Sequence, residues 1–559
     1  MQINYTETIQ EASRNFQWKR EEVVTNLVDF DKVRQKKSLR QFTNEQGIPR
    51  STFRHWVKRK ESIDALAGVT DFLESPEGLA LIHKIVTAAH FAFTKDGVAS
   101  IHNVSTFLKL SGLSPFVASS YSTHRKISNK MDDWIIEFEN KEQPKLIQNM
   151  STKKITLAED ETFHPQICMV AIEPVSNFIL VEKYVKHRDG KTWNDVVFQA
   201  LKGLPVEVIQ VTSDEGRGLI NHTIKGLNAH HSSDCFHVPH EIGKGTSGAL
   251  ASAVKKVKKE YEMTVKLAEK ETSLKEKYDN QLKRPPGRRP NFEKTIGLAE
   301  KQKDQAKSDF EKATKNQETV RNEKAAIGKD YHPYNTETGA KQDSQKVSEL
   351  LELRFKNIKD ATNDLSDRCK KRVEKAHRVV QNMVATIAFF FNMIGLYMDN
   401  LQMSDREKQL MHKYLIPGFY LQKVAQKEKD TDRKLQISKL SQELLLVLTQ
   451  KNGAFSGYSE NDIKMFEKAA EECAQIFQRS SSCVEGRNAQ LSLRHHGIHR
   501  LSNQCLKAQT VVHNYYTRNR DGTTPAERFF NSKHSDLFEW LLGKMDCPAR
   551  PRNHLKKAV

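Results

Sequence analysis

The chain has 559 residues and a formal net charge of +19, from 89 Lys and Arg against 70 Asp and Glu. This length allows several domains, and the basic excess favours a polyanionic partner, nucleic acid before an acidic membrane. The seven cysteines contain no C-x-x-C pair, which argues against a zinc ribbon and a disulfide framework. Because the first residues also lack the basic and then apolar pattern of a signal peptide, we expect a cytoplasmic protein.

Residues 31–60 form a basic segment, with ten Lys and Arg against two acids. Gly47 supplies a turn between two predicted helices, and Pro49 opens the second of them. Phe53 and Trp56 would lie on its inner face. The segment resembles a helix-turn-helix, whose second helix enters the major groove of DNA; an ordinary basic helical hairpin is the alternative. The residues expected to contact DNA are Arg50, Ser51, Thr52, Arg54, His55, Lys58 and Arg59.

Residues 67–150 are also predicted to be helical. Within them, residues 97–127 repeat the pattern of a helix, a turn at Ser111-Gly112 and a second helix near Pro115. This segment is either a second helix-turn-helix or a packing domain without DNA contact. In the first case, the residues near phosphate would be His124, Arg125 and Lys126.

The stretch from Lys154 to His240 predicts an α/β core. Short runs of apolar and β-branched residues predict strands, and apolar residues at helical spacing predict the helices between them. The chain order is three strands, a helix, a strand, a helix and a last short strand. The third, fourth and last strands are predicted at Asn177–Val185, Val206–Thr212 and Cys235–Val238.

Two acids, Asp160 and Asp214, lie on the first predicted strand and at the end of the fourth. Functional groups gather at such strand ends in open α/β sheets. Two adjacent carboxylates repel unless a cation lies between them, and Mg²⁺ prefers oxygen ligands. The pair therefore suggests a metal site that needs a third acid. Glu159 and Glu161 flank Asp160 and would point to the opposite face, so whether Glu159 or Asp160 is the first ligand stays open.

Residues 242–477 predict a large helical insertion in this α/β domain. Two Lys- and Glu-rich stretches, Ser252–Lys283 and Asn291–Ala326, flank a proline-rich turn and predict a charged helical hairpin. The run Val379–Met398 carries no formal charge and is about long enough to cross a bilayer. We interpret it as a buried core helix, with a membrane span as the alternative.

Glu485 lies in the first turn of a predicted helix that begins near Ser480. One interpretation is a capping box, in which Ser482 caps the helix and Glu485 reaches back to it. The other is that Glu485 faces the two aspartates and completes the metal site. A helix packed on the sheet can present a first-turn acid to the strand ends, so spacing alone leaves both open.

The tail, VVHNYYTRNRDGTTPAERFF, resembles the ending of many DDE transposases and retroviral-type integrases. The whole chain resembles a bacterial insertion-sequence transposase of the DDE class, over residues 36–240 and 478–545. The segments that carry the resemblance are, in order, LAEDETF, VTSDEGRG, DCFHVPHE, SSSCVEGRN and DGTTPAERFF.

This resemblance implies a ribonuclease H-like α/β catalytic core, interrupted by an all-α insertion and preceded by all-α DNA-binding segments. It implies that Asp160, Asp214 and Glu485 are catalytic and bind two Mg²⁺ or Mn²⁺ ions. Glu485 follows Asp214 by 271 residues, an unusually long spacing that fits transposases with a helical insertion. The implied domains are 1–66 (helix-turn-helix), 67–150 (second helical domain), 151–241 (first part of the core), 242–477 (insertion) and 478–559 (last part of the core).

The implied activity is metal-dependent cleavage and strand transfer at the ends of a mobile DNA element. The implied partners are double-stranded DNA, as element ends and as target, and further copies of the chain in a homodimer or higher homo-oligomer. A sequence-specific DNA-binding protein with an inactive core is the alternative. A third hypothesis, a structural coiled-coil scaffold, rests only on residues 252–326.

Cys235, His237 and His240 form C-x-H-x-x-H, which lacks a fourth ligand and the usual spacing of a zinc site. At the end of the last predicted strand, His237 would instead be a neighbour of the active site, beside the metal ions or the scissile phosphate, or a histidine of the core.

Overall fold

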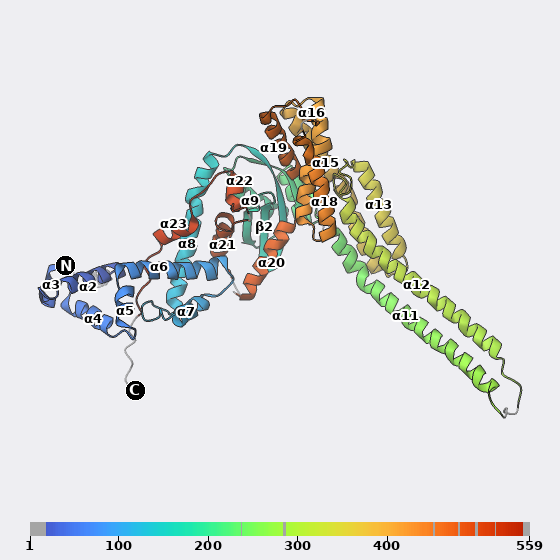
Figure 1. The fold of residues 1–559 in the computed structure, drawn as a ribbon, viewed down its shortest axis with the longest axis horizontal. Coiled ribbons are helices and arrows are strands. Elements are labelled where there is room, and N and C mark those ends of the chain that lie inside the picture. The colour runs from blue at the N-terminus through green and yellow to red at the C-terminus, as the bar shows by residue number, and fades with distance from the viewer. Residues whose placement is uncertain are drawn as a thin grey trace.

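The computed structural model describes residues 18–235, 237–282, 287–450, 453–478, 481–497, 501–519 and 521–551. Figure 1 shows a small sheet near the middle of an elongated molecule, with the N-terminal helices at one end. A helical body lies beside the sheet, and two long helices extend from it toward the other end.

The N-terminal region is entirely helical in its described part. Its elements are α2 (Arg20–Val33), α3 (Leu39–Glu45), α4 (Arg50–Glu61), α5 (Ala67–Leu73), α6 (Pro76–His90), η1 (Phe91–Asp96), α7 (Ile101–Leu110) and α8 (Tyr121–Gln148). The predicted helix pair is confirmed as α3 and α4. Gly47 between them has φ +64°, a conformation that glycine adopts at no steric cost. Phe42 and Phe53 pack between the two helices and α2 in a small apolar core.

The prediction for the second possible helix-turn-helix was wrong about the start of one helix. Its second helix, α8, begins at Tyr121 and not near Pro115. His124 is fully buried, with its Nδ1 2.9 Å from Nε2 of His90, so it cannot contact phosphate. Arg125 and Lys126 are exposed. The helical spacing was read correctly, but packing of α8 against α6 and η1 turned His124 inward.

The sheet has the order β3-β2-β1-β4-β5. β1 pairs antiparallel with β2 and parallel with β4; β2 pairs antiparallel with β3, and β4 parallel with β5. The strands are β1 (Lys153–His164), β2 (Gln166–Glu173), β3 (Phe178–Val185), β4 (Val206–Ser213) and β5 (His230–Ser233).

The prediction of the last strand at Cys235–Val238 was wrong, because the strand is β5 and α11 already begins at His237. β5 has the polar sequence His-His-Ser-Ser, which gives no apolar pattern to detect. Its side chains are buried and hydrogen-bonded instead. The Oγ of Ser232, for example, lies 2.9 Å from Oγ1 of Thr386.

Different helices cover the two faces of the sheet. On one face, Leu157 and Val211 join a core with Trp193 of α9. On the other, Ala158 and Val170 pack against the helix that follows the insertion, α20. The elements beyond α8 in this domain are α9 (Gly190–Leu201), α10 (Arg217–Asn221), η2 (His222–Gly226), α20 (Ser482–Gly497), α21 (Asn503–Tyr515), α22 (Pro525–Phe530) and α23 (Leu537–Lys544).

The predicted insertion is helical in its described part, apart from an isolated β-bridge between Tyr334 and Lys341. It comprises α11 (His237–Asp279), α12 (Phe292–Asp330), α13 (Ser344–Ala361), α14 (Asp367–His377), α15 (Val380–Asn400), α16 (Asp405–Leu410), η3 (Met411–Leu415), α17 (Ile416–Lys427), α18 (Thr431–Leu445), η4 (Leu446–Leu448) and α19 (Glu460–Ile476). Of the described helical stretches, Asp367–Asn400 alone has the length and apolar composition for a membrane span. Its α15 part buries Ile387, Phe390 and Ile394 in the core of the insertion, which favours the core-helix interpretation.

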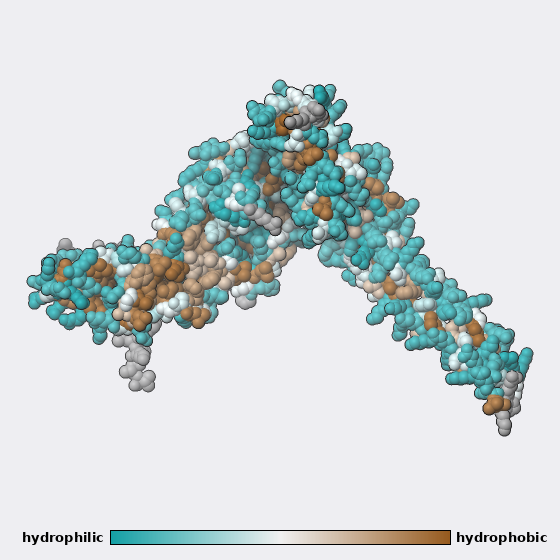
Figure 2. Space-filling view, viewed as in Figure 1, coloured by the Kyte–Doolittle hydropathy of each residue, from teal (hydrophilic) through white to brown (hydrophobic). Residues whose placement is uncertain are grey.

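The charged hairpin is confirmed as α11 and α12, which run side by side away from the body (Figure 1). Few apolar side chains are buried along it: Ala268 and Ala299 lie between the helices, and Tyr261 stacks on Phe310. Figure 2 shows a mostly hydrophilic surface along the hairpin, interrupted by small apolar spots.

The two ends of the insertion meet at the sheet. Asp234, just before α11, accepts hydrogen bonds from the backbone N–H and the hydroxyl of Ser481, just before α20. The amide of Gln210 on β4 donates to the carbonyl of Gln478 at 2.9 Å. The chain therefore leaves and re-enters the α/β domain at neighbouring points.

Candidate active site

Asp160 lies near the middle of the central strand β1, on the face that α20 covers. Its Oδ1 accepts the backbone N–H of Glu161 at 2.8 Å, and its Oδ2 accepts Nδ2 of Asn488 on α20 at 2.9 Å. Burial raises the pKa of Asp160 to about 6, with a further contribution from the charge of Asp214. The two carboxylates are therefore close enough to repel each other, as the sequence predicted.

Asp214 follows directly after β4, the parallel neighbour of β1. Its Oδ1 accepts the backbone N–H of Gly216 at 2.8 Å, which fixes the carboxylate in the turn. A Cβ on Gly216 would lie 2.8 Å from this oxygen, so a larger residue there would displace the Asp214 carboxylate. The parallel pairing of β1 with β4 brings Asp214 to the side of Asp160.

His237 is the first residue of α11 and does not end a strand, contrary to the prediction. Its proximity to the site is seen in the pKa of Asp160, which a charge on His237 lowers. The backbone N–H of His237 donates to the carbonyl of Asp234 at 3.1 Å, so the tight turn after β5 sets its position. His237 therefore lies where the insertion leaves the candidate site.

Glu485 occupies the first turn of α20 and is exposed. α20 begins at Ser482, so Ser482 is not the N-cap that the capping-box interpretation required. Three residues after Glu485, on the same side of the helix, Asn488 contacts Asp160. Asn488 thus contacts the sheet, whereas Glu485, one turn nearer the start of α20, is exposed and forms no metal-binding group with the two aspartates among the described residues.

Asn488 is the site residue that the sequence reasoning missed. Besides its hydrogen bond to Asp160, its Oδ1 is buried and has no hydrogen-bond partner among the described residues. A buried polar atom left unpaired costs free energy, and a bound cation or water molecule would remove that cost. The signal was its spacing of three residues from Glu485.

The two glutamates that flank Asp160 lie on the other face of β1. Glu159 is fully buried, with its Oε1 3.4 Å from Nε2 of His222. Glu161 accepts Nε1 of Trp193 at 3.0 Å and pairs with Arg188 at 3.2 Å. Of these three consecutive acids, Asp160 is the one on the α20 face beside Asp214.

α20 is fixed to the sheet by a buried ion pair. Arg487 donates two hydrogen bonds to the carboxylate of Glu182 on β3, at 2.6 and 2.7 Å, and the hydroxyl of Thr510 donates a third at 2.8 Å. Burial opposes the charge on Glu182, yet the Arg487 guanidinium holds the pKa of that carboxyl below its ordinary value. This pair orients the helix that carries Glu485 and Asn488.

The donor set suits a hard divalent cation in chemistry. Two carboxylates, one with a raised pKa, and an unpaired amide oxygen are ligands of the kind that Mg²⁺ and Mn²⁺ take. Within the described ranges, however, no three His, Cys, Asp or Glu side chains lie close enough together to hold a metal ion. Asp160, Asp214 and Asn488 therefore offer suitable ligand atoms by type, and Glu485 would have to turn toward them to complete a site of three carboxylates.

The predicted DNA-contacting residues lie on α4, and most of them face solvent. Arg59 differs: its guanidinium donates to the carbonyl of Pro551 at 2.7 Å, so it is turned into the protein, and burial lowers its pKa. Thr52 is partly buried. The exposed members are Arg50, Ser51, Arg54, His55 and Lys58.

Comparison with known proteins gives one family. A model described as a family of unknown function, DUF6399, matches residues 411–557. The match begins at η3, in the second half of the insertion, and continues through α20 and the C-terminal helices. No curated protein and no solved structure matches the chain.

Proposed function

We propose that the chain is a DNA transposase of the DDE class, a polynucleotidyl transferase with a ribonuclease H-like core. One observation carries the proposal. Asp160 on the central strand, Asp214 at the end of its parallel neighbour and α20 meet on one face of a β3-β2-β1-β4-β5 sheet, although a long insertion separates α20 from the strands. Acidic groups brought together on one face of a sheet can hold the divalent cations that phosphodiester chemistry uses.

Asp160 and Asp214 would hold two Mg²⁺ or Mn²⁺ ions, with Glu485 as the third carboxylate. Bound there, the ions would activate water or a 3′-hydroxyl and stabilise the entering and leaving oxygens of a phosphodiester exchange. Asn488 orients the Asp160 carboxylate through its amide. His237, at the start of α11, would donate a hydrogen bond to a phosphate oxygen; its charge acts on Asp160, which supports a position near the aspartates.

The exposed residues of α4 would bind the element ends. Arg50 and Arg54 are four residues apart and so share one face of the helix, which suits entry into the major groove. A basic chain with such a helix suits double-stranded DNA. Two ends require two active sites, so a homodimer or higher homo-oligomer on DNA is proposed as the working form.

Cleavage of DNA that carries the inverted repeats flanking the coding region tests the proposal. The wild-type chain with Mg²⁺ is expected to nick at the repeat end and to join the exposed 3′-OH to target DNA. Asp214→Asn is expected to abolish both products, while Asp195→Asn, an exposed acid on α9, retains them. Robust cleavage by Asp214→Asn refutes the assignment of the site.

A second candidate is a sequence-specific DNA-binding protein with an inactive core. The observation that favours it is the exposed position of Glu485, outside the aspartate pair. For this candidate, repeat DNA would bind tightly but remain uncut by the wild-type chain at every Mg²⁺ and Mn²⁺ concentration.

A further inference from the structure

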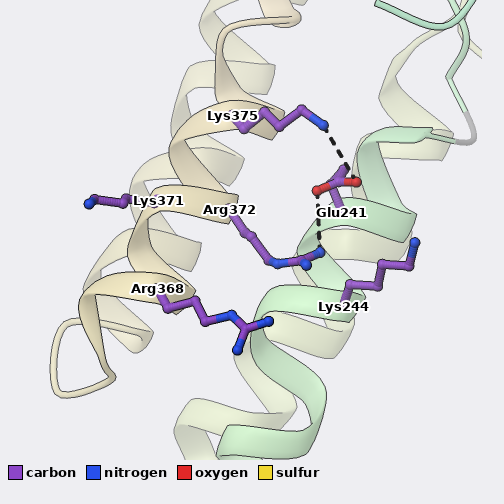
Figure 3. Close-up of a pocket in the computed structure, with 6 residues that line it drawn as sticks. All are labelled: Glu241, Lys244, Arg368, Lys371, Arg372 and Lys375. Carbon is purple, nitrogen blue, oxygen red and sulfur yellow. Dashed lines mark ion pairs between the residues drawn. The ribbon is translucent and has the colours of Figure 1, made fainter.

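A basic groove lies where α14 crosses the first turns of α11 (Figure 3). It has a volume of about 580 Å³ and is open to solvent. Five cations and one carboxylate line it, a formal charge of +4. The lining residues are Glu241, Lys244, Arg368, Lys371, Arg372 and Lys375.

Close packing of the two helices brings these charges together. A Cβ on Gly245 of α11 would lie 2.8 Å from the Cβ of Arg372 on α14, so glycine permits the contact. Arg368, Arg372 and Lys375 recur every three or four residues and therefore share the side of α14 that faces α11. The close packing of α14 on α11 thus concentrates the positive charge in the groove.

Only part of this charge is neutralised. Glu241 pairs with Arg372 at 3.5 Å and with Lys375 at 3.6 Å, and both cations point toward it in Figure 3. Lys244 and Arg368 are exposed and form no ion pair with any described residue. One carboxylate cannot balance the cations around it, so the groove favours an anion with several charges.

The groove begins next to the candidate active site. Glu241 lies four residues after His237 on α11, and Lys244 seven residues after it. At about 1.5 Å per residue, Lys244 is roughly 10 Å along the helix from His237. A DNA strand carries one phosphate per about 3.4 Å of helix axis, so this distance spans about three nucleotides.

We propose that the groove binds the phosphodiester backbone of DNA that extends from the candidate active site. The choice of DNA as the ligand rests on the proposed function, because the active site would fix where the bound strand begins. Lys244 and Arg368 contact phosphate oxygens, and the pairs with Glu241 hold Arg372 and Lys375 in place. The groove reads charge and not sequence, so it serves flanking or target DNA.

The test compares two double charge reversals in the full-length chain, with EDTA present so that no metal ion contributes. Lys244→Glu/Arg368→Glu alters the groove. Lys434→Glu/Lys464→Glu changes the net charge equally, at exposed positions on α18 and α19. The probe is a fluorescent random-sequence duplex of about 30 base pairs, with anisotropy measured between about 50 and 200 mM KCl.

The groove variant is expected to bind the duplex at least fivefold more weakly and to lower the salt slope by about 2, because two phosphate contacts are lost. The control variant is expected to stay within twofold of wild type. Equal weakening of both variants would show a net-charge effect and overturn the proposal. Unchanged binding by the groove variant would also overturn the proposal. A melting curve for each variant verifies folding.

The outcome is independent of catalysis. This binding assay contains no metal ion, so cleavage cannot contribute to its result. If the groove variant loses affinity but repeat-end cleavage does not depend on Asp214, DNA binding by the groove is supported and the proposed function is refuted. If cleavage depends on Asp214 while the groove variant binds DNA normally, the proposed function is supported and DNA binding by the groove is refuted.

Discussion

Replacing Asp160 with asparagine is predicted to stabilise the metal-free protein. Burial raises the pKa of this carboxyl from its ordinary 3.8 to about 6, so the charged form is disfavoured in the folded state. A pKa difference of about 2 corresponds to about 3 kcal/mol of folding free energy at neutral pH, taken as an upper bound. Asp160→Asn removes this cost because its amide is neutral.

The sign follows from proton binding. Between about pH 4 and pH 6 the folded state holds a proton on Asp160 that the unfolded state has lost, so stability falls as pH rises through this window. Below about pH 4 both states are protonated, and the variant gains nothing. The stabilisation by Asp160→Asn is therefore absent at low pH, grows through the window and is complete above about pH 6.

The surroundings can accept the amide. The Glu161 N–H still has the oxygen of the new side chain, and rotation of the Asn488 amide presents its unpaired Oδ1 to the new N–H₂ group. Differential scanning calorimetry in EDTA is expected to show a rise of about 5–10 °C at pH 7.5 for the α/β transition. The control, Asp195→Asn, is expected to melt with wild type. An unchanged or lowered transition for Asp160→Asn would refute the argument that this carboxylate is destabilised by burial.

Three further predictions concern other parts of the chain. Arg487→Met leaves Glu182 buried and unpaired, and is expected to lower the unfolding free energy by about 3–5 kcal/mol in urea denaturation, with partial recovery when Glu182→Gln is added. Arg50→Ala or Arg54→Ala is expected to weaken repeat-end binding by about 1–3 kcal/mol if the residue reads a base; equal loss on random DNA would assign it to phosphate. Deleting residues 265–306 with a Gly/Ser bridge is expected to keep folding and Mg²⁺ binding but to impair paired-end assembly in gel-shift assays, and full strand transfer by this variant would show that the hairpin is dispensable.

The sequence predicted the elements whose burial leaves an apolar pattern. β4 concentrates Val and Ile as a strand buried on both faces does, and the hairpin helices are recognisable by their charge and length. β5 was misplaced because its buried side chains are polar and are satisfied by hydrogen bonds to residues distant in the sequence, such as Thr386. The inward turn of His124 likewise depends on a contact with His90 that periodicity does not encode.

The candidate site was partly predictable for the same reason. The strand pattern placed Asp160 on the first predicted strand and Asp214 at the end of the fourth, and the structure pairs these two strands. The contact of α20 with the site depends on how the insertion folds back onto the sheet. The spacing of residues in the sequence does not predict that. The hydrogen bond from Asn488 to Asp160, and the bond between Asp234 and Ser481 that closes the insertion, appear only in three dimensions.

A crystal structure with Mn²⁺ and repeat-end DNA, with anomalous scattering recorded, tests the central claim most directly. The account predicts two Mn²⁺ peaks about 3.5–4 Å apart, held by Asp160 and Asp214, with the Glu485 side chain turned inward as the third carboxylate. Two results would contradict the assignment of these three acids as one catalytic centre. One is the absence of an anomalous Mn²⁺ peak between the two aspartates. The other is Mn²⁺ bound there, with DNA present, while Glu485 does not contact it.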